Sequence, residues 1–211
     1  MIETEVGPVY DRQAASYDAG RARVLFERAW LERFAHGLPS GGRVLDLGCG
    51  AGEPIARWLI ENGFRVTGID LSAAMLAIAR RRWPKGDWRQ ADMRRLDLGE
   101  RFDGILGWDS FFHLTPDDQR ATIPVLARHL APGGVLLLTV GPDRAEATGH
   151  VGGEKVYHAS LSPADYAVRL KDCGLRLTGF LAEDPDCDFH SVLMARKDHP
   201  CRTEEENRCQ S

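Results

Sequence analysis

The sequence is poor in the features that mark metal-binding, secreted or membrane proteins. Its five cysteines are scattered over 211 residues and form no Cys-x-x-Cys pair, which argues against a zinc site or a redox motif. The longest apolar run, Val135–Leu138, is far too short to cross a bilayer. Residues 1–10 are acidic and lack the apolar segment of a secretory signal. We therefore expect a cytoplasmic protein with no membrane contact and no resident metal.

An excess of basic residues is also absent. The chain has 27 lysines and arginines against 31 aspartates and glutamates, a net charge of −4. Dedicated nucleic-acid-binding proteins usually carry a basic face, so no nucleic-acid partner is expected. The apolar fraction of 43% and the charged fraction of 27% are typical of a soluble globular protein, and the length suits one domain.

Short apolar segments alternate with helical patterns through most of the chain. We expect one helix that ends near residue 61 and three more at about 72–82, 116–130 and 163–173. Strands are expected at 43–47, 64–69, 87–90, 102–107, 135–140, 175–181 and 189–196. This alternation predicts an α/β fold: a doubly wound, mostly parallel sheet with helices on both faces. No helix separates the last two strands, so they must form a hairpin whose last strand is antiparallel.

Three segments lie outside this rhythm. Residues 9–36 are expected to form one helix, so that residues 1–40 make an N-terminal helical cap region. Residues 141–160 are expected to be an irregular loop over the active face. Residues 197–211 form a polar tail that we expect to be disordered. The predicted domain covers residues 1–196.

A glycine-rich loop follows the first predicted strand, with Gly48, Gly50 and Gly52 in a G-x-G-x-G pattern. The dinucleotide-binding fingerprint would require Gly or Ala where this chain has Glu53. Carboxylates at Asp46 and Glu53 would repel a pyrophosphate but suit a ligand with an ammonium group and a sulfonium. S-adenosylmethionine has both groups and no phosphate, so a NAD-dependent oxidoreductase is disfavoured.

Aspartates stand at three successive strand ends. Asp70 lies about 20 residues beyond the glycines, where a carboxylate accepts hydrogen bonds from ribose hydroxyls. Asp92 is placed to meet the adenine edge, and Asp46 precedes the glycine loop. A single aspartate at a strand end is commonly a turn former or a helix cap. Three in succession favour the adenosylmethionine site.

These segments resemble the class I, seven-strand S-adenosylmethionine-dependent methyltransferases of the small-molecule type. The resemblance rests on Val44–Gly52, Val66–Leu76, Gln90–Met93, Phe102–Leu114, Leu130–Val140 and the Tyr10-Asp11…Tyr17-Asp18 segment, and it covers about residues 10–196. It implies a sheet in the order 3-2-1-4-5-7-6 with the last strand antiparallel. It also implies S-adenosylmethionine as cofactor and S-adenosylhomocysteine as product.

The resemblance further implies where the cofactor binds. It should extend across Gly48–Gly52, with its ribose on Asp70 and its adenine between Leu71 and Met93. Met75 is either a neighbour of the adenine or a core residue. The complete expected set is Tyr17, Asp46, Gly48, Cys49, Gly50, Asp70, Leu71, Met75, Asp92, Met93 and Trp108.

The end of the fourth strand should face the methyl group. This chain has neither an Asn/Asp-Pro-Pro-aromatic motif nor a Pro-Cys pair there, which argues against methylation of DNA bases. His113, Asp109 and His190 are the candidate general bases, because removing a proton from the acceptor assists transfer. As alternatives, His113 anchors the loop before Pro116, Asp109 binds the cofactor or the backbone, and His190 is a plain turn residue. Phe111, His150, Tyr157 and His158 are candidate substrate-binding residues.

Taken together, the sequence predicts an S-adenosylmethionine-dependent methyltransferase that acts on an oxygen or nitrogen of a small-molecule acceptor. Two alternatives stay open at this point. One is a non-catalytic adenosylmethionine-binding regulatory protein, and the other is a methyltransferase acting on RNA or protein. The chain is expected to be a monomer or a homodimer.

Overall fold

A seven-stranded sheet organises the computed structural model, which describes residues 6–21 and 23–199. Its strands are β1 Arg43–Leu47, β2 Arg65–Asp70, β3 Asp87–Gln90, β4 Phe102–Gly107, β5 Leu130–Val140, β8 Leu175–Asp184 and β9 His190–Lys197. They lie in the order β3-β2-β1-β4-β5-β9-β8, in which β1–β5 are parallel and β9 is antiparallel to both neighbours. The predicted fold class and strand order are confirmed.

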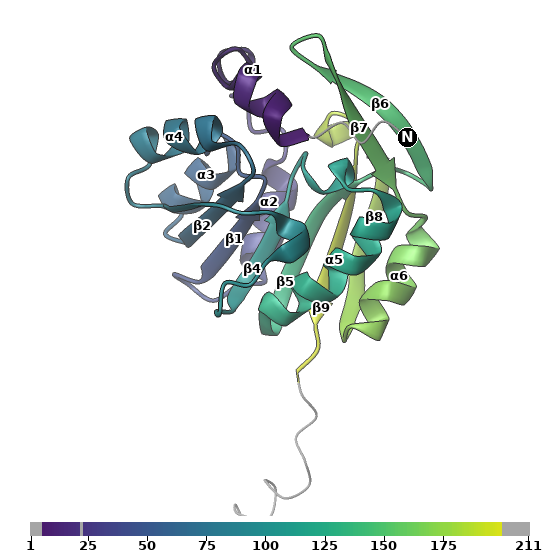
Figure 1. Ribbon diagram of the computed structural model, residues 1–211. Helices are drawn as coiled ribbons and strands as arrows, with labels where there is room; N and C mark the ends of the chain where they lie inside the picture. The colour runs from purple at the N-terminus through teal and green to yellow at the C-terminus, as the bar shows by residue number, and fades with distance from the viewer. Residues whose placement is uncertain (1–5, 22, 200–211) are drawn as a thin grey trace, which may run out of the picture.

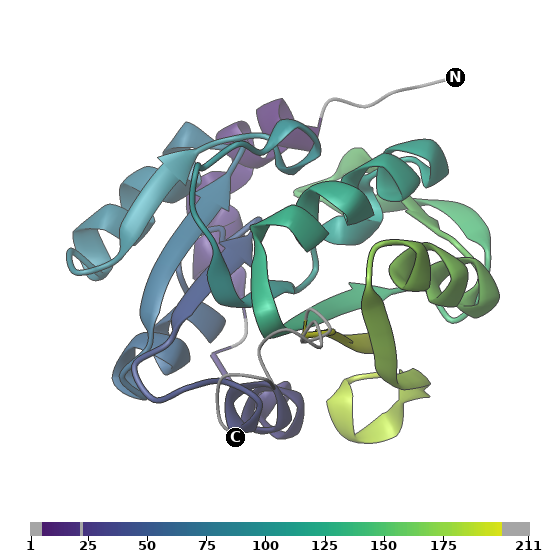
Figure 2. The same cartoon turned by 90° about the horizontal axis from the view of Figure 1, so that it is seen from below.

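Helices cover both faces of this sheet (Figures 1 and 2). One face packs against α2 Arg28–His36, α3 Ile55–Glu61 and α4 Ala73–Arg82, and the other against α5 Pro116–His129 and α6 Pro163–Asp172. Side-chain oxygens of Ser72, Thr115 and Ser162 accept a backbone N–H in the first turns of α4, α5 and α6. Since both faces are covered, the central strands are buried and almost entirely apolar.

The first helical region differs from the prediction. Instead of one helix over 9–36, α1 Val6–Gly20 and α2 are separate. Trp30, Leu31 and Phe34, which suggested a long helix, are buried against the sheet by α2 alone. Val24, in the connection, is 74% exposed. The break lets α1 leave the sheet face and cross over the carboxyl ends of the strands (Figure 1).

The segment 141–160 also differs from the prediction, because it forms a β-hairpin rather than an irregular loop. Its strands, β6 Ala145–Val151 and β7 Glu154–Ser160, pair in continuous antiparallel register. Gly152 and Gly153 turn the chain with φ of 56° and 84°. Two successive positive φ values suit the tight hairpin turns whose twist matches that of the strands.

The hairpin and α1 meet above the strand ends and together form a roof (Figure 1). Val9 of α1 packs against Val151 and Val156 of the hairpin. Nearby, the Glu154 carboxylate accepts hydrogen bonds from Arg12 and Gln13. The roof thus joins two segments that lie about 140 positions apart in the sequence.

The last strand extends one residue into the predicted tail. Lys197 still belongs to β9, and its ammonium donates hydrogen bonds to the carbonyls of Ala127 and Leu130. Residues 200–211, where the rest of the predicted tail falls, lie outside the described residues. None of the helices in 6–21 and 23–199 is long and apolar enough to cross a membrane, and these residues contain no group of three His, Cys, Asp or Glu side chains placed to hold a metal ion.

Candidate active site

A cavity of about 1200 Å³ lies between the roof and the carboxyl ends of β1–β4. All the residues expected to bind the cofactor line it: Tyr17, Asp46, Gly48, Cys49, Gly50, Asp70, Leu71, Met75, Asp92, Met93 and Trp108. They come from α1 and from four strand ends, which the parallel sheet brings to one edge. The structure therefore gathers the whole predicted set around one space.

The glycine loop is held against two neighbouring strand ends. Gly48 has φ of 66° and lies so close to Ser110, after β4, that a Cβ atom at Gly48 would be 2.4 Å from the Ser110 Cβ. On the other side, the Gly50 N–H donates to Asp70 Oδ2 at 2.8 Å, and the Ser72 N–H donates to Asp70 Oδ1 at 2.8 Å. Glycine is required at position 48 by both its φ and this close approach.

Two buried carboxyl groups form the floor of the cavity beneath this loop. Burial and the charge of Asp70 raise the pKa of Asp46 to about 7. Burial also raises the pKa of Asp70, against the lowering effect of the Ser72 and Gly50 backbone N–H groups. Such an arrangement favours a positively charged ligand, because a cation relieves the repulsion between the carboxylates.

Three other cofactor candidates have roles of their own in the fold. Asp92 accepts the Arg94 N–H at the start of a 3₁₀ turn, Met93–Arg95, and is also ion-paired with the Arg94 guanidinium. Met75 is 1% exposed, so it belongs to the core as well as to the cavity wall. Burial raises the pKa of the Cys49 thiol well above its ordinary value, which argues against a nucleophilic role.

His113 is fixed on both sides. Its Nδ1 lies 3.0 Å from the carbonyl oxygen of Tyr157, and its Nε2 lies 3.1 Å from the Tyr10 hydroxyl. Burial lowers the pKa of His113 to about 4, so the ring is neutral at pH 7. A neutral ring must then donate from Nδ1 and accept the Tyr10 proton at Nε2. His113 therefore ties the two halves of the roof to the sheet, and its basic nitrogen is already occupied.

This arrangement predicts how stability depends on pH. The pKa of His113 is depressed from 6.5 to about 4, so its contribution to folding is present above pH 6.5 and is lost as the pH falls toward 4. Between pH 6.5 and pH 4, the unfolding free energy of the wild type should fall by roughly 2 to 3 kcal/mol more than that of His113→Asn. Denaturant unfolding at several pH values measures it. His36→Asn, on α2, is the matched control, and an unchanged slope in His113→Asn would contradict the role given to burial.

Asp109 and His190 form a second fixed pair. His190 Nε2 lies 2.9 Å from Asp109 Oδ1, and its Nδ1 lies 2.9 Å from the Cys187 carbonyl oxygen. Burial lowers the pKa of His190, but the hydrogen bond and the charge of Asp109 outweigh it and raise the pKa to about 8. At pH 7 the ring is an imidazolium that donates from both nitrogens. Asp109 lines the cavity, whereas His190 does not.

Further charged side chains lie close to Asp109. An Arg21 nitrogen lies 3.6 Å from Asp109 Oδ2, and another lies 3.7 Å from Glu27, a carboxyl that is fully buried. Burial raises the pKa of Glu27. Asp109 also has φ of 50°, a conformation that few residues other than glycine adopt. Its carboxylate is thus held toward the cavity by the backbone and by two cationic side chains.

The structure brings one of the four expected substrate-binding residues to the cavity wall. Tyr157 lines it, and its hydroxyl donates to Glu146 at 2.7 Å. Phe111 is instead 0% exposed in the core, and His150 is exposed on β6 beyond the cavity. His158 packs on the rings of Phe112 and His113 behind the wall, with centroid separations of 4.7 and 4.9 Å.

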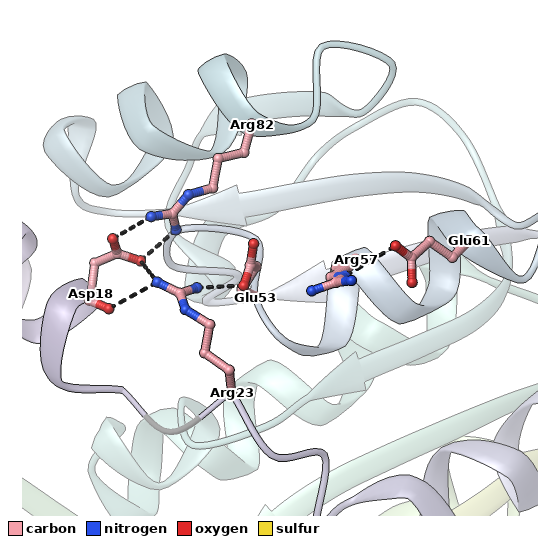
Figure 3. A network of polar contacts seen from close by, with 6 residues as sticks. All are labelled: Asp18, Arg23, Glu53, Arg57, Glu61 and Arg82. Carbon is pink, nitrogen blue, oxygen red and sulfur yellow. Dashed lines mark hydrogen bonds and ion pairs between the residues drawn. The ribbon is translucent and has the colours of Figure 1, made fainter.

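Ion pairs connect α4, the segment after α1 and the residue after the glycine loop, as Figure 3 shows. Arg82, in the last turn of α4, makes two hydrogen bonds of 2.5 Å with the Asp18 carboxylate. Arg23 bridges Asp18 to Glu53 beside the glycine loop, while Arg57 pairs with Glu61 along α3. Glu53, expected to repel phosphate, is therefore paired with Arg23.

Sequence reasoning missed several residues that line the cavity, including Arg21, Arg23, Ser110, Glu146 and Thr148. Arg21 and Arg23 were not expected to line the cavity, because they follow a break after α1 that the sequence did not indicate. Glu146 and Thr148 alternate along β6, so the Gly152-Gly153 turn was the signal that would have placed them.

Comparison with known proteins agrees with this geometry. Residues 44–134 match the family model described as a methyltransferase domain. Over 103 residues the chain is 42% identical to dTDP-4-amino-2,3,4,6-tetradeoxy-D-glucose N,N-dimethyltransferase of Saccharopolyspora spinosa, covering 48% of this chain and 41% of that one. Trans-aconitate 2-methyltransferase of an Azoarcus species is 40% identical over 103 residues, 48% of this chain and 40% of its own length.

Among solved structures, the CcbJ methyltransferase of Streptomyces caelestis has a TM-score of 0.72 at 20% identity, with 94% of this chain and 100% of that one covered. The chain spans about two fifths of the length of the two curated relatives above. The matched segment runs from β1 through the glycine loop into β5, so it coincides with the parallel part of the sheet. Residues 44–134 therefore resemble a methyltransferase domain, and the chain has the fold of a solved methyltransferase.

Proposed function

We propose that this protein is an enzyme that transfers a methyl group from S-adenosylmethionine to a nitrogen or oxygen of a small molecule. The observation that carries the proposal is the glycine loop above the buried Asp46 and Asp70 carboxyls. All three arginines on the cavity wall, Arg21, Arg23 and Arg94, already lie beside carboxylates, which leaves no evident partner for a pyrophosphate. This electrostatic environment suits a sulfonium ligand and not a dinucleotide.

The cavity residues divide into groups with separate tasks in this proposal. Asp46 and the loop Gly48–Gly50 would hold the amino-acid portion of the cofactor. Asp70 would accept its ribose hydroxyls, since each carboxylate oxygen keeps a lone pair beyond the one used by Gly50 or Ser72. Leu71 and Met93 would flank the adenine. The cofactor supplies an electrophilic methyl carbon, and the protein contributes mainly by aligning the acceptor with it.

Asp70→Asn tests the proposal. The amide cannot accept the Gly50 and Ser72 N–H groups and the ribose hydroxyls as the carboxylate does, so the affinity for adenosylmethionine and adenosylhomocysteine should fall by about 100-fold. Asp172→Asn, an exposed aspartate at the end of α6, is the control with the same change of charge. Calorimetry with both nucleosides and with NAD measures the binding. Binding of NAD, or equal affinities in the two variants, would contradict the proposal.

A further inference from the structure

Part of the cavity is left over once the expected cofactor residues are assigned. It lies between β4 and the roof, and we call it the acceptor end; besides His113, it is lined by Tyr10, Asp109, Glu146, Thr148 and Tyr157. Asp109 follows β4, where the methyl group is expected, and the other four belong to the roof. The chemistry of these side chains should therefore reflect the molecule that receives the methyl group.

The acceptor end has negative charge and no cation that is free to bind an anion. Arg21 lies beside Asp109 and Glu27, and Arg94 beside Asp92 and Asp118. Arg23 is paired with Asp18 and Glu53 on the far side of the glycine loop. An acceptor with a carboxylate or phosphate would meet Asp109 and Glu146, while the three arginines on the cavity wall already lie beside carboxylates, an arrangement that costs binding energy.

The acceptor end also lacks the base that a hydroxyl acceptor needs. An alcohol must lose its proton as the new bond forms, which calls for a base whose pKa is near neutrality. His113 Nε2 is occupied by the Tyr10 hydroxyl, and His190 is turned away from the cavity with both nitrogens hydrogen-bonded. A neutral amine needs no such base, because its nitrogen lone pair is already nucleophilic.

We propose that the acceptor is a small amine without a carboxylate or phosphate group, and that Asp109 and Glu146 bind it at its nitrogen; this inference rests on the function proposed above. The amine nitrogen bonds to the methyl carbon as the carbon–sulfur bond breaks, and that electron pair stays on sulfur. The methylated nitrogen then carries one positive charge. An amine that binds as its ammonium loses one proton to water before the nitrogen attacks, and the extra proton of the methylated nitrogen also leaves to water, so that charge and atoms balance.

Aromatic rings at the acceptor end fit the same ligand. The rings of Tyr10 and Tyr157 both line the cavity, and Tyr10 is packed edge-to-face on Tyr17 at 5.3 Å. The faces of aromatic rings attract ammonium groups. Tyr10 cannot itself provide a base, because burial raises the pKa of its hydroxyl further above the ordinary value.

The test uses two matched sets of acceptors with the full chain: glucosamine, glucose and glucuronate, and benzylamine, benzyl alcohol and benzoate. Ligand-observed NMR in the presence of adenosylhomocysteine measures binding, and mass spectrometry after incubation with adenosylmethionine detects the methylated product. We expect an amine to bind and to gain a methyl group, and the two carboxylates to do neither. Glu146→Gln should raise the KM for that amine about threefold to fivefold, as for loss of a partly exposed charge contact, with kcat nearly unchanged.

Glu32→Gln, an exposed glutamate on α2, is the matched control and should leave KM at the wild-type value. Methylation of an alcohol or a carboxylate, or binding of none of the amines, would overturn the amine assignment. Calorimetric binding of adenosylhomocysteine in the same samples separates this outcome from failure of the proposed function. If adenosylhomocysteine itself does not bind, the methyltransferase proposal is the one that fails.

Discussion

Gly48→Ala is expected to weaken the binding of adenosylmethionine by about 100-fold while the protein remains folded, since a displacement of about 1 Å in a site can cost that much. A Cβ atom at this position would lie 2.4 Å from the Ser110 Cβ and 3.1 Å from its Oγ. Ser110 cannot move away freely, because its hydroxyl donates to the Leu47 carbonyl at 2.6 Å within the core. The glycine loop must move instead, and with it the Gly50 N–H that contacts Asp70.

Gly174→Ala provides the matched control for this substitution. Gly174 has φ of 72°, close to the 66° of Gly48, but no atom lies within 4 Å of its Cβ position. Both alanines carry the same left-handed backbone penalty of about 1 to 2 kcal/mol, whereas the collision is specific to position 48. Calorimetric Kd values and thermal melting of both variants separate the two effects. Equal cofactor affinities would show that the loop at Gly48 is not the cofactor cradle.

The second large effect is expected from Asp109→Asn, which should lower kcat about 100-fold while the Kd for adenosylhomocysteine changes less than about threefold. The Asp109 carboxylate lines the cavity, and its two oxygens lie beside the positively charged side chains of His190 and Arg21. With asparagine, the positive charges of His190 and Arg21 are no longer balanced by a carboxylate at the cavity wall. The acceptor end then destabilises an amine that gains positive charge during methyl transfer.

A pH profile identifies this role more sharply than the rate alone. Asp109 raises the pKa of His190 to about 8, so the imidazolium persists up to that pH, whereas its contribution to folding is complete below pH 6.5 and is lost as the pH rises toward 8. In Asp109→Asn the pKa of His190 should fall, so the kcat of this variant should recover in part as the pH rises and the ring loses its charge. Asp172→Asn is again the control. A kcat within threefold of wild type would show that Asp109 has no part in transfer.

The central sheet and most of the cofactor wall were predictable because their signals are local. An apolar strand followed by a small or acidic residue fixes Asp46, Asp70 and Asp92 at strand ends, and parallel pairing brings strand ends to one edge. The roof was not predictable by the same reasoning. Periodicity could not show that the chain breaks after Gly20, and the Gly152-Gly153 turn was overlooked in a segment considered irregular.

The polar pairs at the acceptor end depend on distant parts of the chain. Tyr10 and His113 are 103 positions apart, and Asp109 and His190 are 81 apart. The sequence indicated that His113, Asp109 and His190 were candidates, but not that one histidine is neutral and the other charged. That difference arises from burial in one case and from a carboxylate partner in the other. Similarly, nothing local distinguishes Phe111, in the core, from the neighbouring Phe112.

The position of the roof in the chain has an evolutionary consequence. The segment shared with the methyltransferase domain family, residues 44–134, contains the glycine loop and Asp109, whereas α1, the β6–β7 hairpin and His190 all lie outside it. The glycine loop and Asp109 therefore lie within the shared segment, whereas the part of the acceptor end that the roof contributes lies outside it. A lineage can exchange the hairpin between β5 and α6 and acquire a new acceptor without rebuilding the nucleotide cradle.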